Sequence, residues 1–233
     1  MKILAIVPAR GGSKSVPRKN IAPIAGKPLL AYTIEEALKV SGITDLVLST
    51  DDEEIAAVGR ALGAQVPFLR PAELATDHAQ SAPVLKHCLL HMEASRGEQY
   101  DAVLMLQPTT PLRRAHHIER AISMMSTNLC DSVVSVVSVE GNHPFRMKRL
   151  IGERLINYIE QGFEDMRPRQ VLPPVYIRNG AIYLSRRTVV AELDRIVGEH
   201  CLGFEMPVDE SVNIDDRLDF KMAEILLQEE GGK

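Results

Sequence analysis

The sequence predicts an α/β fold built on a doubly wound, mostly parallel sheet. Short, unbroken apolar runs that are typical of buried strands alternate with segments of helical periodicity, and glycines or capping residues separate the two. This alternation implies right-handed crossovers between parallel strands. A length of 233 residues suits one such domain, so we expect a single domain over residues 1–233.

The expected elements follow one another along the chain, with signals at several boundaries. Gly42 and Gly63 end two helices, and Asp51-Asp52 cap the second of these at its start. Strands are expected at residues 3–7, 45–50, 65–69, 100–106, 132–138 and 175–185. Helices are expected at residues 29–40, 53–62, 81–96, 115–127 and 216–229.

Residues 139–178 depart from this alternation. They contain four prolines, mixed charge and little periodicity. A stretch of that length without clear elements is usually functional or an interaction arm. It also has too few apolar residues to pack as a domain of its own, so we expect an arm that protrudes from the single domain.

Composition excludes several classes of function. The formal net charge of −4 disfavours bulk nucleic-acid binding, which needs a basic excess. No apolar run reaches membrane-spanning length, and the chain opens directly on a core strand, which leaves no room for a signal peptide. The three cysteines, Cys88, Cys130 and Cys201, lack metal-type spacing and indicate reduced thiols. We therefore expect a cytoplasmic protein that binds neither nucleic acid nor membrane.

The loop that follows the first strand is the most informative segment. Residues 8–20 carry four cations (Arg10, Lys14, Arg18 and Lys19) and two adjacent glycines. Glycines let backbone N–H groups approach a ligand, and open α/β sheets bind polyphosphates at the carboxyl ends of their strands. The spacing matches neither a Walker A loop nor the Gly-x-Gly-x-x-Gly fingerprint. A basic surface loop is the alternative.

Further motifs extend along the chain. They are Leu69 to Asp77 with Ser81, Leu106 to Arg113, Pro168 to Pro173, Asn179 to Tyr183, and Ser211 to Asp216. Together with the 8–20 loop they resemble the CMP-acylneuraminate synthetase family, the cytidylyltransferases that activate nonulosonic (sialic-type) acids, over nearly the whole chain. The resemblance implies a Rossmann-type fold of the nucleotide-diphospho-sugar transferase kind. Lys19-Asn20 disfavours the related branch that activates Kdo.

The resemblance also implies roles for individual residues. Arg10, Lys19, Gln107 and Asp215 would be catalytic, the first two as phosphate-neutralising cations and Gln107 beside the reacting hydroxyl. CTP would be held by Ala9, Gly11, Gly12, Ser13, Lys14, Asn20, Arg70 and Ser81, the last two at the cytosine ring. Acceptor contacts would come from Thr109, Arg146, Lys148, Arg169, Asn179 and Tyr183.

Several of these roles have a plainer alternative. Arg70 is also consistent with a loop ion pair, and Ser81 with a helix cap. Arg146 and Lys148 are also compatible with solvated charges on the arm. Arg169 offers a planar fork that suits the carboxylate of an α-keto acid.

Asn213 and Asp215 are the candidate metal ligands. Many members of the resembling family have Asp-Ile-Asp, and this chain has Asn213-Ile214-Asp215. Residues spaced i, i+2 on an extended segment share one face, and hard oxygen ligands suit Mg²⁺. We expect Asp215 to be the main ligand, with Asn213 offering a neutral oxygen. His87 with His91, and the pair His116-His117, are expected to be helix residues without a metal.

The resemblance implies transfer of CMP from CTP to the C2 hydroxyl of a nonulosonic acid, with release of pyrophosphate and with Mg²⁺ as cofactor. It also implies a homodimer in which the 139–178 arm reaches toward the partner's site. A cytidylyltransferase for Kdo or an amino-Kdo acid is one alternative. A non-catalytic nucleotide-binding protein is another, favoured by Asn213. Neuraminate, legionaminate and pseudaminate all remain open as acceptors.

Overall fold

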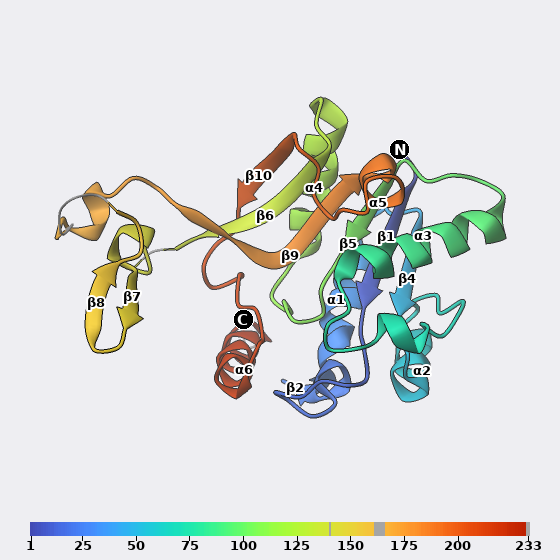
Figure 1. Ribbon diagram of the computed structural model, residues 1–233. Coiled ribbons are helices and arrows are strands. Elements are labelled where there is room, and N and C mark those ends of the chain that lie inside the picture. Colours follow the sequence, from blue (N-terminus) through green and yellow to red (C-terminus); the bar gives the residue numbers. More distant parts are fainter. Residues whose placement is uncertain (140, 161–165, 232–233) are drawn as a thin grey trace.

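The computed structural model describes residues 1–139, 141–160 and 166–231. A six-stranded sheet runs in the order β10-β6-β9-β5-β1-β4 (Figure 1). Its strands are β1 (Ile3–Pro8), β4 (Asp45–Ser49), β5 (Ala102–Met105), β6 (Ser132–Ser138), β9 (Tyr176–Arg186) and β10 (Cys201–Glu205). The helices are α1 (Leu29–Leu38), α2 (Glu53–Ala61), α3 (Ser81–Arg96), α4 (Ala115–Thr127), α5 (Arg187–Ala191) and α6 (Arg217–Gly231).

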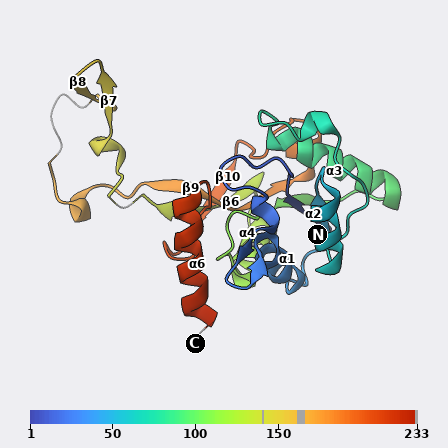
Figure 2. The same cartoon turned by 90° about the horizontal axis from the view of Figure 1, so that it is seen from below.

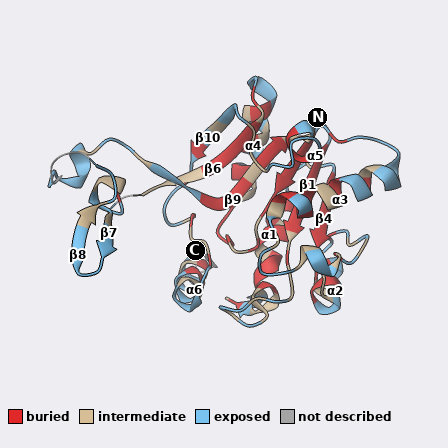
Figure 3. Cartoon of the chain, in the orientation of Figure 1, coloured by how far each residue is buried: buried red, intermediate tan, exposed pale blue. Residues whose placement is uncertain are grey.

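The core of the protein lies on both faces of this sheet. Alternate side chains of β1 point to opposite faces: Ile3 packs in one cluster with α1, α2 and α4, whereas Leu4 packs in another with α3 and α5. Buried residues therefore follow the central strands in Figure 3. A third cluster packs Ala223 and Leu227 of α6 on Leu29. The two helical layers confirm the doubly wound arrangement.

Strand directions decide where a ligand can enter. β1 is parallel to β4 on one side and to β5 on the other, so the chain reverses its winding at β1. At such a switch point the connections leave a crevice at the carboxyl ends of the strands. β10 is parallel to β6, whereas β9 runs antiparallel between β5 and β6. The sheet is thus mostly parallel, as predicted.

The longer elements match the prediction closely, although the short helix α5 and two hairpins at residues 23–28 and 148–157 were not expected. The main sheet differs from the prediction in two places. The expected strand at residues 65–69 is wrong, because only Gln65 bridges to Val47 of β4. Pro67 lacks the N–H that would continue the ladder. β10 was not expected at all. It is a short edge strand containing Gly203, a pattern too weak to detect by alternation.

The arm projects away from the sheet. Figures 1 and 2 agree that a hairpin of β7 (Lys148–Ile151) and β8 (Arg154–Asn157) extends beyond the far ends of β6 and β9. Those ends pair with each other at Val137 and Ile177 and form the stalk. The hairpin leaves Leu150, Ile151 and Leu155 between 61% and 70% exposed. Residue 140 and residues 161–165 of the expected arm lie outside the described residues.

Two smaller features complete the described chain. A short hairpin of β2 (Pro23–Ile24) and β3 (Lys27–Pro28) precedes α1. Single 3₁₀ turns lie at Lys19–Ile21, Ala72–Leu74, Pro144–Arg146 and Arg169–Val171. Over the part of the chain that the structure describes, each helix is too short or too polar to cross a membrane.

Candidate active site

A cavity of about 610 Å³ lies at the switch point, at the carboxyl ends of β1 and β5. The loop after β1, the loop before α3, the loop after β5 and the segment before α6 all contribute to its wall. Predicted site residues on the lining are Arg10, Ser13, Lys14, Lys19, Asn20, Arg70, Ser81, Gln107, Thr109, Asn213 and Asp215. The sequence analysis gave no role to the other lining residues, which are Pro8, Ser15, Leu74, Thr76, Asp77, Ala79, Val84 and Pro108.

The loop after β1 is shaped by the start of α2. The predicted cap is confirmed, since Asp52 accepts a hydrogen bond from Ile55 N at 3.0 Å. Gly11 N donates to Asp51 Oδ1 at 3.0 Å, and a Cβ on Gly11 would stand 2.8 Å from Asp52 Oδ2. Gly11 therefore allows a close approach to Asp51-Asp52. Its N–H is already engaged there, which corrects the expectation that it is open to phosphate.

Two other predicted nucleotide contacts hold the same loop in place. Ala9 is fully buried and donates its N–H to Ser49 O at 2.9 Å. Asn20 donates from Nδ2 to Arg10 O at 2.9 Å, although it also lines the cavity. Gly12 has open space around its Cβ position. Ala9 thus lies behind the cavity wall, whereas Asn20 forms part of it.

Three cations from the loop reach the cavity, and the fourth turns away. Arg10 pairs with Asp77 at 2.8 Å, and Lys14 pairs with the other oxygen of the same carboxylate. Hydrogen bonds from Lys14 and Arg10 hold the pKa of Asp77 below its usual range. Arg18 instead pairs with Asp52, on the α2 side. Asp77 thus provides the negative charge beside two cations that we expect to meet phosphate.

Lys19 is the most buried cation of this group. Its Nζ donates to Ile214 O at 2.8 Å, which joins the loop after β1 to the segment before α6. Burial lowers the pKa of Lys19, and the nearby Asp215 carboxylate partly opposes that shift. A half-desolvated ammonium at the cavity wall is poised to interact strongly with an anion.

Arg70 and Ser81 form the wall where a base is expected. Arg70 is 6% exposed, and its Nε donates to Ser49 Oγ at 3.0 Å, so the loop ion pair considered above is not what it makes. Burial lowers the pKa of Arg70. Ser81 is the first residue of α3, and Gln80 occupies the cap position without a side-chain bond. The helix-cap alternative for Ser81 is therefore wrong, and Ser81 lines the cavity.

The side chain of Gln107 lies close to Gly180, and its backbone carbonyl accepts a hydrogen bond from Arg113. Its Oε1 lies 2.7 Å from where a Cβ on Gly180 would stand, and Gly180 has φ of +80°. Glycine is thus required there both by backbone conformation and by close approach. Arg113, only 1% exposed, donates to Gln107 O at 3.2 Å and to Ala181 O at 2.9 Å. Burial lowers the pKa of Arg113 to about 9.

Arg113 is a residue whose importance the sequence analysis missed. It also donates to Thr33 Oγ1 at 2.6 Å and to Thr110 Oγ1 at 2.9 Å. A buried guanidinium that bonds to neutral oxygens on α1, β9 and the loop after β5 fixes those parts to one another. The sequence signal that could have indicated the importance of Arg113 was its place in the Leu106 to Arg113 motif.

Asn179 and Tyr183 lie off the cavity, which corrects their placement as acceptor contacts within this chain. Asn179 is 4% exposed, accepts from Ser135 Oγ at 2.6 Å and donates to Ser211 Oγ at 3.0 Å. The amide is thus engaged in joining β6, β9 and the segment before α6. Tyr183 packs against the cluster on the α3 face, and burial raises its pKa.

The predicted acceptor residues of the arm also lie away from this cavity. Arg146 donates to Arg167 O at 2.9 Å, and Lys148 donates to Asn157 Oδ1 at 2.5 Å. Arg169 lies in a 3₁₀ turn of the same arm. Both views show the arm extending away from the loops that line the cavity (Figures 1 and 2). Within one chain, the structure does not bring these three residues to the site.

The residues of the expected metal site meet at the cavity. Ile214 N donates to Thr109 O at 2.8 Å, which brings the segment beside the loop after β5. Asn213 Nδ2 donates to Asp215 Oδ2 at 2.9 Å. Asn213 Oδ1 is buried and has no hydrogen-bond donor among the described residues. A carboxylate and an unsatisfied amide oxygen are hard ligands, so the residues present fit Mg²⁺.

Comparison with known proteins gives consistent similarities. The chain matches the family model described as Cytidylyltransferase over residues 4–206. It is 34% identical to the N-acylneuraminate cytidylyltransferase of Escherichia coli, over 95% of this chain and 51% of that protein. It is also 34% identical to the pseudaminic acid cytidylyltransferase of Campylobacter jejuni, over 97% of this chain and 96% of that one. The chain thus spans about half the length of the Escherichia coli relative.

Two solved structures show the shared fold. CMP:2-keto-3-deoxy-manno-octonic acid synthetase complexed with CTP has a TM-score of 0.70 at 20% identity, covering 99% of this chain and 100% of that one. A 4-diphosphocytidyl-2C-methyl-D-erythritol synthase has a TM-score of 0.69 at 13% identity, covering 97% and 98%. The predicted fold class is confirmed.

Proposed function

This chain belongs to the cytidylyltransferase family and is a nucleotidyltransferase, and on that basis we propose that it transfers CMP from CTP to the C2 hydroxyl of a nonulosonic acid, releasing pyrophosphate. One observation carries the proposal. A single cavity at the switch point brings Arg10, Lys14 and Lys19 together with Gln107 and Asp215. Cations, an amide and a carboxylate in that arrangement suit phosphoryl transfer from a nucleotide to a hydroxyl.

The C2 hydroxyl attacks the α-phosphorus in line and gives up its proton to water. The bond between the α-phosphorus and the oxygen that bridges to the β-phosphate breaks, and pyrophosphate leaves on the opposite side. Such a reaction needs mainly positioning and charge neutralisation. Arg10 and Lys19 stabilise the charge on the phosphates. The side-chain amide of Gln107 orients the attacking hydroxyl; Gly180 leaves space for this amide, and Arg113 bonds to the backbone carbonyl of the same residue. Asp215, with Asn213 beside it, would hold Mg²⁺, which would supply further neutralisation of the phosphate charge.

We assign recognition of the cytosine base of CTP to the cavity wall that contains Arg70 and Ser81. Cytosine presents a carbonyl acceptor at O2 and an amino donor at N4. A guanidinium can donate to the former, and a hydroxyl can accept from the latter. Because Ser49 holds Arg70 at 3.0 Å, the guanidinium is already oriented before nucleotide enters.

The acid is assigned to a site completed by a second copy of the chain. Its carboxylate needs a cation, and Arg169 of the arm offers a fork. Arg146 and Lys148 lie on the same arm, which in one chain extends away from the cavity (Figure 1). The hairpin's exposed Leu150, Ile151 and Leu155 provide apolar area for a contact between subunits. A homodimer with exchanged arms accounts for both observations.

The first test measures pyrophosphate release. With Mg²⁺ and a panel of N-acetylneuraminate, legionaminate, pseudaminate, Kdo and an amino-Kdo acid, we expect turnover with CTP and at least one acid other than Kdo. ATP, GTP and UTP in place of CTP should give little product. Equal turnover with ATP, or CTP binding without pyrophosphate release for every acid, would contradict the proposal, and the second result would favour a non-catalytic nucleotide-binding protein.

The second test addresses the shared site. Arg169→Ala and Lys19→Ala are each expected to be nearly inactive, and sedimentation should show a dimer at micromolar concentration. After the two variants are mixed and exchanged, half of the dimers are hybrids and one of their two sites is intact, so about one quarter of wild-type activity should return. If Arg169 serves its own chain, the mixture stays inactive. A fully active monomer would also exclude the exchanged arm.

A further inference from the structure

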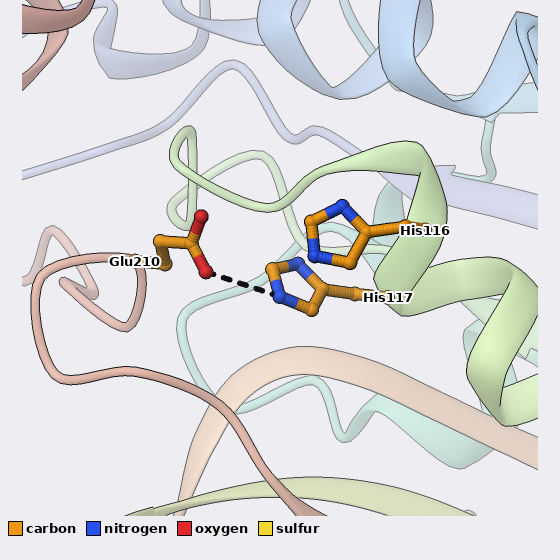
Figure 4. Close-up of side chains that lie close together, drawn as sticks. All are labelled: His116, His117 and Glu210. Atoms are coloured by element: carbon orange, nitrogen blue, oxygen red, sulfur yellow. Dashed lines mark ion pairs between the residues drawn. The ribbon is translucent and has the colours of Figure 1, made fainter.

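His116, His117 and Glu210 form a cluster outside the proposed catalytic cavity. The two histidines lie in the first turn of α4, and Glu210 lies on the segment that follows β10 (Figure 4). His117 Nε2 is 3.1 Å from a Glu210 carboxylate oxygen, and one ligand atom from each residue falls within 4.8 Å of the others. Composition alone would suggest a metal site.

The position of the proton on His117 argues against a metal. Its Nδ1 accepts a hydrogen bond from Arg114 N at 3.1 Å, so the lone pair of the neutral ring is on Nδ1 and the proton is on Nε2. Burial lowers the pKa of His117 to about 4, which keeps the ring neutral near pH 7. A metal on Nε2 would need the other tautomer, whose Nδ1–H would face the backbone N–H of Arg114. The contact is therefore an Nε2–H donated to a carboxylate.

That hydrogen bond joins two parts of the proposed site. His117 follows directly on the loop that carries Gln107, and Glu210 belongs to residues 206–215, which end at Asp215. Residues 207–215 form no helix or strand, so side-chain bonds, single backbone bonds and the burial of Ile214 in the third cluster decide where they lie. Other bonds that hold this segment are Ser211 Oγ with Asn179 Nδ2 at 3.0 Å, Ile214 N with Thr109 O at 2.8 Å, and Lys19 Nζ with Ile214 O at 2.8 Å.

We propose that Glu210, through its hydrogen bond with buried His117, is a positioning residue that holds residues 206–215 so that Asp215 stands at the cavity. The inference rests on the proposed function for the role of Asp215 in holding a divalent cation. Glu210 touches no substrate and acts only through the segment. A hydrogen bond to a charged acceptor is among the stronger hydrogen bonds. Its loss is therefore expected to raise about tenfold the fraction of molecules in which residues 206–215 are displaced.

The test compares three variants of the full chain. Glu210→Ala removes the acceptor, Glu210→Gln keeps an oxygen that can accept from Nε2–H, and Glu205→Ala removes an exposed carboxylate beside the same histidines. Mn²⁺ serves as the probe, because it takes the oxygen ligands that suit Mg²⁺. Its binding to the protein with CTP is measured by electron paramagnetic resonance, and hydrogen exchange is followed at residues 211–215.

For Glu210→Ala we expect Mn²⁺ affinity to fall about tenfold and exchange at residues 211–215 to rise by a similar factor, with little change at β1. Glu210→Gln and Glu205→Ala should resemble wild type in both measurements. If Glu210→Ala merely destabilised the fold, hydrogen exchange would instead become faster throughout the sheet, and Glu210→Gln would not restore the exchange rates of wild type.

Three results would overturn the inference. If wild type binds Mn²⁺ with CTP and Glu210→Ala binds it equally well, positioning by Glu210 is wrong while the proposed function stands. If wild type itself binds no Mn²⁺ with CTP, the metal role of Asp215 fails as well. Stoichiometric Zn²⁺ binding that His116→Ala abolishes would show that the cluster is a metal site.

Discussion

Lys19→Ala is expected to lower kcat/KM by at least about 100-fold, the effect of removing one well-placed donor to a transition-state anion. Its ammonium is half-buried at the cavity wall and bonds to Ile214 O at 2.8 Å. A cation in a partly desolvated position interacts with phosphate more strongly than one in water. Steady-state kinetics with CTP varied at saturating acid measure the loss.

Arg10→Ala should lower kcat/KM by a similar factor, because Arg10 lines the cavity and pairs with Asp77 through one terminal nitrogen of its guanidinium. Lys27→Ala is the matched control. Lys27 carries the same charge as Lys19, lies in the same part of the chain and pairs with Glu35 away from the cavity. Activity of the control should stay within about twofold of wild type, as for exposed surface charges.

Thermal stability separates catalysis from folding for Lys19. Desolvation lowers the pKa of Lys19, so the folded protein binds this proton less tightly than the unfolded chain. At pH values below the ordinary lysine pKa, the positive charge of Lys19 therefore lowers the free energy of unfolding. Lys19→Ala should melt close to wild type. A melting shift of the size produced by a core cavity, with activity retained, would show that Lys19 is structural.

Asp215→Asn is expected to lower kcat on the order of 100-fold. A divalent cation contributes several kcal/mol of charge stabilisation, and about 3 kcal/mol corresponds to roughly 100-fold in rate. Asn replaces a charged ligand with a neutral one, which weakens a hard-cation site far more than the loss of a neutral oxygen. Raised Mg²⁺ should restore activity only in part. Near-normal activity at limiting Mg²⁺ would show that the ligand lies elsewhere.

Asp216→Asn provides the control for this variant. Its Oδ1 accepts from Leu218 N at 2.7 Å and Asp219 N at 3.0 Å, so Asp216 caps α6 and lies off the cavity lining. Losing that charge should affect helix stability modestly. The Mg²⁺ dependence of the rate should remain that of wild type.

Asn213→Asp tests the departure from the family pattern. Asn213 Nδ2 now donates to Asp215 Oδ2 at 2.9 Å. With aspartate there, two carboxylates would face each other, and a cation between them would relieve their repulsion. Mg²⁺ binding should therefore tighten while kcat stays within about tenfold of wild type. Asn213→Ala should cost less than Asp215→Asn, and equal losses would indicate a site with two equivalent ligands.

Local features of the sequence determined much of the fold. Residues 81–96, 115–127 and 132–138 have the predicted bounds, because periodicity and boundary residues act within a few positions. The cap at Asp52 follows the same logic. The gathering of the loops after β1 and β5 at one edge also followed from sequence, since the carboxyl ends of parallel strands lie together.

Contacts between distant residues were decided only in the tertiary structure. Asp77 lies 67 positions from Arg10, and Glu210 lies 93 positions from His117, separations at which no periodicity operates. Gly11 and Gly180 are small because Asp52 and Gln107 approach them, which a loop motif alone does not reveal.

The sequence by itself thus determined the family, most of the longer strands and helices, and most of the residues that line the cavity. The tertiary structure decided how those residues are held: the antiparallel insertion of β9, the buried guanidinium of Arg113, and the departure of the arm from its own site. The physical reason is that hydrogen bonds and close packing depend on distance in space, whereas a motif records only distance along the chain.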